Sequence, residues 1–301
     1  MRRDLILKII CIAFVLLSTL ARLIHIDSTV IGWHSWRQAD TAAMARNFHE
    51  TGEGMFYPRA DWGGGGYVET EFQVYTYAVS LLYGVFGVHE AIGRLVSVFM
   101  SLLAILGLYL LTRRFHDERT ALIAATIYAV IPLSMFYGRA FMPEPTLIAA
   151  IIWGLFFFDR WRSEGRITDG IMAWLAVAMA VLLKIPTLYI GLPLFFIAWT
   201  NSGSARRVLL APSLWLFAFG LFAVTALWYT HAHSLYKLSG NTFGIWTGST
   251  DKWGNYSSLL TFKFYNDVFF KSIAERHLTW PGMLIFIYGL TIKRRDRKSV
   301  V

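Results

Sequence analysis

The chain has 301 residues, of which 56% are hydrophobic and 16% are charged, and it carries a formal net charge of +9. An apolar fraction above the roughly 45–50% of soluble domains argues against an ordinary soluble protein and indicates one that crosses a membrane several times. The basic residues lie in short clusters between apolar segments, which is the positive-inside pattern of membrane proteins and indicates no nucleic-acid partner. The single cysteine, Cys11, excludes a disulfide within the chain.

The first apolar segment, residues 5–24, predicts a membrane span that starts from a cytoplasmic N-terminus. No small-residue cleavage site follows it, so we expect an uncleaved span rather than a signal peptide. A hydrophilic outer loop covers residues 25–70. The apolar residues 72–88 then predict a helix on the outer surface, because a crossing there would place the basic cluster at 113–119 outside. Tyrosines are typical of such an interface, and this segment contains Tyr75, Tyr77 and Tyr83.

Seven further apolar segments complete the prediction of an all-α polytopic membrane protein with about eight transmembrane helices. They cover residues 91–111, 121–137, 145–158, 168–183, 186–199, 208–230 and 282–292. Residues 1–230 are then the main transmembrane module, residues 231–280 an outer loop, and residues 281–301 the last span with a basic cytoplasmic tail. This arrangement places every basic cluster on the cytoplasmic side.

The same topology gathers polar side chains on the outer face. They are Asp40, Glu69, Glu71, Arg139, Glu144, Lys184, His231 and His233, joined by Tyr75 of the interfacial helix. An ionisable group at membrane depth costs roughly 2.5–3.5 kcal/mol even on lenient scales, so we expect these residues to line a cavity.

Asp40 lies in the stretch HSWRQAD, where Ser35 and Gln38 have the spacing of a capping box. The pattern predicts a helix from about Trp36 to His49, with Asp40 in its second turn. Two interpretations stay open for Asp40: a surface carboxylate that is paired with Arg37 or lies on a solvated face, or a catalytic carboxylate just above the membrane.

The other candidates also have two interpretations each. Glu144, between two prolines, suits either a helix N-terminus or catalysis. Arg139 and Lys184 suit either anchoring at the interface or binding of a phosphate. Glu69 and Glu71 are either rim acids or part of the site. His231 and His233 could hold a metal on extended backbone or donate hydrogen bonds to a phosphate, or do neither.

Several stretches, taken in chain order, carry a family resemblance. They are WRQADTAAMARNF, ETEFQVYTYAVSLLYGVFGVHEAIGRLVSVFMSLLAILGLYLLTRRF, YGRAFMPEPTL, LLKIPT and WYTHAH. Together they resemble the GT-C glycosyltransferases, in the branch of protein O-mannosyltransferases and lipid A aminoarabinose transferases (glycosyltransferase family 39 and its bacterial relatives). The fold this implies is a GT-C helical bundle with interfacial helices on the outer face.

The resemblance implies transfer of a hexose or pentose from a polyprenyl-phosphate carrier to a glycan, lipid or protein acceptor, in the cell (inner) membrane and on its extracytoplasmic side. It places Asp40 at the family's central acidic position, Glu144 at a second acidic position, and Lys184 at the lipid-phosphate site. Relatives often carry a Lys-Pro-Pro motif where this chain has Glu69-Thr70-Glu71-Phe72. They also usually continue for several more spans, so we expect a short or truncated member.

The resulting hypothesis makes Asp40 the general base, with Arg139, Lys184 and one or both of His231 and His233 stabilising the departing phosphate. The sequence does not require a divalent metal and leaves metal dependence open. The alternatives are a non-catalytic membrane protein that binds or transports a polyprenyl lipid, and a membrane scaffold.

Overall fold

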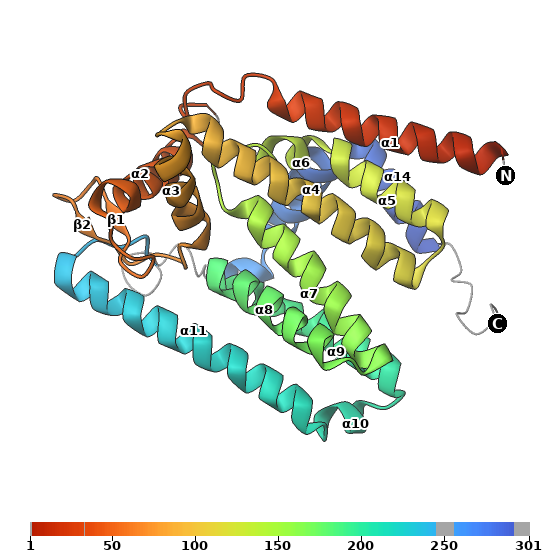
Figure 1. The fold of residues 1–301 in the computed structure, drawn as a ribbon. Coiled ribbons are helices and arrows are strands. Elements are labelled where there is room, and N and C mark those ends of the chain that lie inside the picture. The colour runs from red at the N-terminus through yellow and green to blue at the C-terminus, as the bar shows by residue number, and fades with distance from the viewer. Residues whose placement is uncertain (1, 33, 245–255, 292–301) are drawn as a thin grey trace. The chain divides into compact units, whose positions relative to one another are not determined.

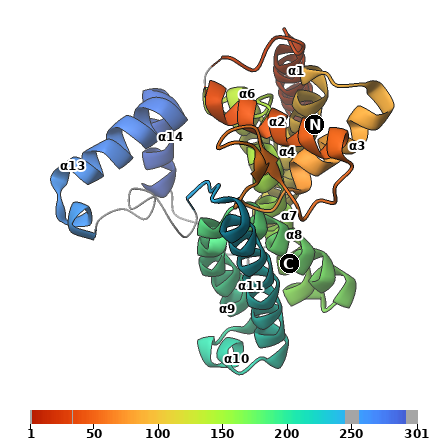
Figure 2. The same cartoon turned by 90° about the vertical axis from the view of Figure 1, so that its left-hand side faces the viewer.

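The computed structural model describes residues 2–32, 34–244 and 256–291 (Figure 1). The chain divides into two compact units, Met1–Val130 with Ser134–Gly248, and Ile131–Leu133 with Ser249–Val301. All the site residues predicted from the sequence belong to the first unit, which Figure 2 shows from a second direction.

The first unit is built almost entirely from helices. Its α-helices are α1 (Arg2–Leu23), α2 (Ser35–Thr51), α3 (Val74–Phe86), α4 (Glu90–Phe115), α5 (Glu118–Val130), α7 (Glu144–Glu164), α8 (Ile167–Leu183), α9 (Gly191–Ser202), α10 (Ala205–Leu209) and α11 (Pro212–Ser239). The 3-10 helix η1 (Ile185–Ile190) precedes α9. Strands β1 (Arg59–Ala60) and β2 (Gly66–Tyr67) form a small antiparallel hairpin, and α6 (Pro132–Tyr137) has residues in both units. The second unit contains the 3-10 helix η2 (Tyr256–Leu260), α13 (Phe262–Tyr265), the π-helix η3 (Asn266–Leu278) and α14 (Thr279–Thr291).

In the described part of the chain, α1, α4 and α11 are long and apolar enough to cross a membrane. The helical, membrane-spanning class is therefore confirmed, whereas the total of about eight spans stays a prediction. The segment predicted over 121–137 is two helices, α5 and α6, because Pro132 disfavours helical backbone at the residue before it. The predicted outer loop from 231 was also wrong at its start, since α11 continues unbroken to Ser239.

Small residues let the central helices of the first unit approach closely. A Cβ on Gly154 of α7 would lie 2.8 Å from a methyl carbon of Val177 on α8, and one on Gly107 of α4 would lie 3.0 Å from Ile152 and Trp153 of α7. Close approach at small residues is a usual way to pack helices in a membrane, where no hydrophobic effect drives them together.

At one end of the first unit, basic residues from the clusters that the sequence places on the cytoplasmic side form ion pairs with acids of neighbouring helices. Arg114 of α4 lies 2.6 Å from Asp159 of α7, and Arg160 of α7 lies 3.2 Å from Asp169 of α8. At the start of the chain, Lys8 of α1 lies 2.9 Å from Glu118 of α5. These pairs place the first three basic clusters, at the start of α1 and near the ends of α4 and α7, at one end of the bundle, opposite α2 and α3 (Figure 1).

Helices α2 and α3 pack together at the other end. Their shared core contains Ala45, Tyr75, Val79 and Tyr83, with Phe141 from the turn before α7. The prediction that the Tyr75 and Tyr83 side chains lie at a membrane interface was therefore wrong, because both are buried in this core. The exposed apolar side chains of α3 are instead Leu81, Val85 and Phe86.

Candidate functional site

The first turn of α2 is tied to the turn that precedes α7. His34, in the left-handed conformation, is the N-cap of α2, and Ser35 is its first helical residue, so the predicted capping box is wrong. The Gln38 side chain instead reaches across the site, where its Oε1 accepts a hydrogen bond of 3.1 Å from the backbone N–H of Phe141. This contact holds the helix that carries Asp40 against the segment that leads to Glu144.

Tyr75 holds α3 against α4 and the same turn. Its hydroxyl donates to the carbonyl of Gly93 at 2.7 Å and lies 2.9 Å from Ser97 Oγ. Ser97 Oγ in turn donates to the Ala140 carbonyl at 2.6 Å. Burial raises the pKa of the Tyr75 phenol, so this residue stays a neutral hydrogen-bonding support in the structure. Because these contacts already occupy its hydroxyl, Tyr75 has no free polar group for the predicted role in substrate binding.

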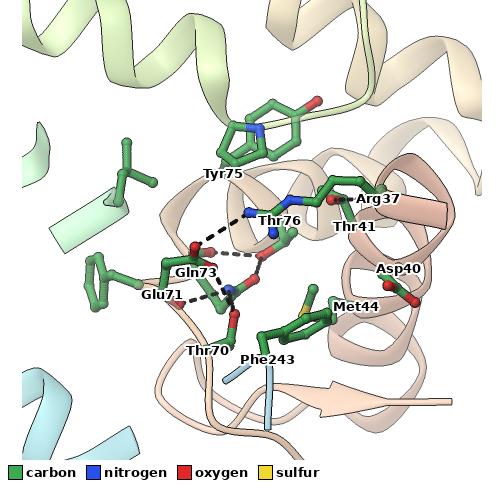
Figure 3. Close-up of a pocket in the computed structure, with 13 residues that line it drawn as sticks. Arg37, Asp40, Thr41, Met44, Thr70, Glu71, Gln73, Tyr75, Thr76 and Phe243 are labelled. Carbon is green, nitrogen blue, oxygen red and sulfur yellow. Dashed lines mark hydrogen bonds and ion pairs between the residues drawn. The ribbon is translucent and has the colours of Figure 1, made fainter. Parts of the chain in front are cut away.

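A narrow pocket of about 20 Å³ lies between α2 and the chain leading into α3 (Figure 3). Arg37 Nη2 lies 3.4 Å from Glu71 Oε1 in its wall, and Thr70 Oγ1 donates to the other carboxylate oxygen at 3.3 Å. Gln73 Nε2 donates to the Glu71 carbonyl at 2.7 Å. Asp40 also lines this pocket, together with Pro143 and Leu183, the residues immediately before Glu144 and Lys184.

Glu144 and Lys184, predicted separately, form an ion pair. Lys184 Nζ lies 2.7 Å from Glu144 Oε1, with 33% and 15% of the two side chains exposed. Pro186, two residues after Lys184, has no backbone N–H to continue α8, and Lys184 lies in extended backbone between α8 and η1. Glu144 is the first residue of α7, where the helix dipole favours a carboxylate. Its other oxygen, Oε2, is buried without a hydrogen bond in the described residues.

Asp40 differs from the other acids of the site. The interpretation that Arg37 neutralises it as an ion pair is wrong, because Arg37 pairs with Glu71. Within the described part of the chain, the Asp40 carboxylate makes no hydrogen bond or ion pair, and Figure 3 shows it apart from the hydrogen bonds around Glu71. Partial burial raises the pKa of Asp40, Arg37 lowers it, and nearby Asp61 raises it further.

The two predicted histidines do not converge. They lie in α11 rather than on extended backbone, and residues two apart on a helix point about 200° away from each other. His231 Nε2 lies 2.8 Å from the Phe56 carbonyl, and His233 Nδ1 lies 3.1 Å from Glu69 Oε1. Thr242 also bonds to Glu69, which is completely buried. These contacts tie the outer loop to the end of α11.

No site for a metal is found among residues 2–32, 34–244 and 256–291, where no three histidine, cysteine, aspartate or glutamate side chains come together as a metal site would need. Arg139 does not line the pocket either; its guanidinium donates to the His25 carbonyl at 3.0 Å. The structure thus brings Asp40, Glu71 and Tyr75 to one pocket, with the Glu144–Lys184 pair beside it.

Sequence reasoning missed the residues that position the outer loop. Arg94, buried near the start of α4, donates to the carbonyls of Ile26 and Thr29 at 3.0 Å each, and also to the Ser28 carbonyl. An arginine inside the first turns of an otherwise apolar helix was the available signal, because such a charge must find partners. Gln38 gave no comparable signal, since its partner is a backbone N–H far away in the sequence.

A family model described as dolichyl-phosphate-mannose-protein mannosyltransferase matches residues 73–229. The matched segment begins just before α3 and ends within α11, so it contains Tyr75, the Glu144–Lys184 pair and most of the helical core. The helical architecture and this family match support a membrane glycosyltransferase of the GT-C class. The chain belongs to the dolichyl-phosphate-mannose-protein mannosyltransferase family.

Among solved structures, the chain is similar to an oligosaccharyltransferase from Archaeoglobus fulgidus, whose crystal structure is described as a complex with Zn and sulfate. The TM-score is 0.49 and the sequence identity is 20%, over 92% of this chain and 38% of that chain. This chain thus spans well under half the length of that solved protein. The comparison with curated proteins gives no match.

Proposed function

We propose that this chain transfers a sugar from a polyprenyl-phosphate-linked donor to an acceptor on the extracytoplasmic face of a membrane. The observation that carries the proposal is the Asp40 carboxylate, which lines a pocket beside the Glu144–Lys184 pair and makes no hydrogen bond or ion pair within the described residues. A carboxylate left without partners inside a paired site is available to take a proton. Membership of the family supplies the class of reaction.

In the proposed reaction, Asp40 removes the proton from an acceptor hydroxyl or amine. The freed electron pair of the acceptor attacks the anomeric carbon, and the bond between that carbon and the lipid phosphate oxygen breaks. The leaving phosphate takes the electrons of this bond, and the single displacement inverts the anomeric centre. A positioned general base contributes typically about 10²–10⁴ in rate.

Lys184 is the cation we assign to the leaving phosphate, because a charge that develops in the transition state is best met by a group already in place. Glu144 holds Lys184 at 2.7 Å, and we assign it the role of positioning that ammonium. Arg37, which lies 3.4 Å from Glu71, is a second cation, a guanidinium, at the pocket. Arg139, His231 and His233 have backbone or carboxylate partners outside the pocket, which weakens their earlier assignment to the phosphate.

The extracytoplasmic placement rests on charge. The basic clusters of α1, α4, α5 and α7 lie at one end of the first unit, and the positive-inside rule assigns that end to the cytoplasm. The pocket lies at the opposite ends of α4, α7 and α8. From the sequence, we propose in addition that both the N- and the C-terminus are cytoplasmic. Labelling of single cysteines introduced at Asp27 and at Arg166 in intact cells tests this topology, and labelling of Arg166→Cys from outside would contradict it.

Purified Asp40→Asn protein tests the reaction. Asparagine keeps the shape of the side chain and removes the base, so we expect transfer to fall by at least about 10². Asp27→Asn, an exposed acid of the same outer loop, is the matched control and should keep full transfer. Full transfer by Asp40→Asn would refute the assignment of the base. A lipid-binding or transport protein would instead tolerate Asp40→Asn and lose binding of the lipid phosphate when Lys184 is replaced.

A further inference from the structure

A second, wider cleft lies on the other side of Asp40. It has a volume of about 520 Å³, within the usual range of small-molecule sites. Helix α2 forms one wall with Asp40, Arg46 and three alanines, the hairpin contributes Asp61 and Trp62, and the start of α4 contributes Glu90. Tyr83 of α3 completes the lining. Asp40 therefore faces both the narrow pocket and this cleft.

The charges of the cleft do not suit an anion. Its acids are Asp40, Asp61 and Glu90, and its one cation in the described lining is Arg46. Arg46 is already held by Asp61 at 2.5 Å, with Glu50 at 3.8 Å on its other side. A phosphate entering the cleft would meet more negative than positive charge, without a guanidinium free to bind it.

Several polar groups of the cleft lack partners. Tyr83 has only 3% of its surface exposed, yet within the described residues its hydroxyl makes no hydrogen bond. Tyr83 lines the cleft, so its hydroxyl can exchange a hydrogen bond with water for one with a ligand. Trp62 is 37% exposed, and the ring of Phe243 packs edge-on against it at 5.4 Å. Neither the Trp62 indole N–H nor the Asp40 carboxylate has a hydrogen-bond partner in the described part of the chain.

We propose that this cleft is the acceptor subsite and that it takes an uncharged, hydroxyl-rich carbohydrate. A sugar has apolar C–H faces that pack on indole and phenol rings, and hydroxyls that both donate to carboxylates and accept from Tyr83 and Trp62. The proposal rests on the proposed function, because the acceptor hydroxyl must lie within hydrogen-bond reach of Asp40. It separates the two substrates: the phosphate of the donor belongs beside Lys184, and the uncharged acceptor belongs on the other side of Asp40.

Binding to a glycan array tests this without requiring transfer. The full chain in lipid nanodiscs is applied to neutral oligosaccharides, to their phosphorylated counterparts and to lysine-rich peptides. We expect neutral oligosaccharides to be bound and their phosphorylated forms to bind at least tenfold more weakly. Tyr83→Phe should weaken the neutral binding about two- to tenfold, which corresponds to one hydrogen bond. Tyr57→Phe, on a partly exposed tyrosine outside the cleft, is the matched control and should bind as the parent does.

Charge reversal provides a gain of function. Glu90→Lys, at an exposed position, should raise the affinity for phosphorylated glycans, so that they bind less than tenfold more weakly than the neutral ones. The inference is overturned if no neutral glycan binds, if phosphorylated glycans or peptides bind better, or if Tyr83→Phe and Tyr57→Phe behave alike. Its failure is distinguishable from failure of the proposed function. Neutral-glycan binding with full transfer by Asp40→Asn would refute only the base, whereas Asp40-dependent transfer to a phosphorylated acceptor would refute only the subsite.

Discussion

Replacement of Gly93 by alanine tests how the site is held together. A Cβ at Gly93 of α4 would lie 2.2 Å from Cε2 and 2.3 Å from Cζ of Phe141, distances at which atoms cannot coexist. Phe141 is completely buried, and its backbone N–H is fixed by Gln38. The ring cannot move without shifting the turn that carries Glu144.

Overpacking a well-packed core costs about 1–3 kcal/mol, and the fixed ring places this site in the upper part of that range. Alanine also gains up to about 1 kcal/mol over glycine inside a helix, so the net loss should be about 2 kcal/mol. Gly84→Ala in α3 is the matched control, since nothing lies within 4 Å of its Cβ, and it should keep or raise stability.

Thermal unfolding of both variants in one detergent measures the difference, and we expect the midpoint to fall by several degrees for Gly93→Ala alone. Phe141→Leu, which removes part of the ring, should lower the cost of Gly93→Ala, so that the double variant loses less than the sum of the two single variants. Equal midpoints for Gly93→Ala and Gly84→Ala would refute the account of how this turn is packed.

Further predictions concern charges. Lys184→Met leaves Glu144, only 15% exposed, without its ion-pair partner and should lower the midpoint of thermal unfolding. Adding Glu144→Gln should restore the midpoint but not sugar transfer. Restored transfer in the double variant would contradict the role of Lys184. Arg94→Ala frees three carbonyls of the loop at 26–29, so hydrogen exchange there should accelerate; unchanged exchange would show that Arg94 does not hold the loop. Burial and Asp61 raise the pKa of Asp40, so transfer should fall as the pH drops through that raised pKa, because the base must be ionised. The folded pKa then exceeds the unfolded one, so ionised Asp40 costs stability at neutral pH, and Asp40→Asn should unfold no earlier than the parent; a clearly lower midpoint would contradict this.

The sequence by itself determined the class of protein and predicted on which side of the membrane its charges lie. In a membrane, a helix satisfies all the backbone hydrogen bonds of a long uncharged apolar run within the run itself, and α1, α4 and α11 lie where such runs occur. Local signals also placed the break after Lys184, where Pro186 prevents α8 from continuing, and the helix start at Glu144, between two prolines. These features depend on neighbours in the sequence, and a single sequence contains them.

Tertiary structure alone decided which polar side chains of the site have an ion-pair or hydrogen-bond partner and which do not. Glu144 and Lys184 are 40 positions apart, and only the packing of α7 against α8 makes them partners. Arg37, three residues from Asp40, instead pairs with Glu71, and the two histidines turn to different partners because α11 continues past them. A side chain's partner is set by distance in space, and sequence spacing predicts that distance only within one helix or strand. That physical limit is why the sequence could suggest Asp40, whereas only the folded chain shows that its carboxylate has no partner among the described residues.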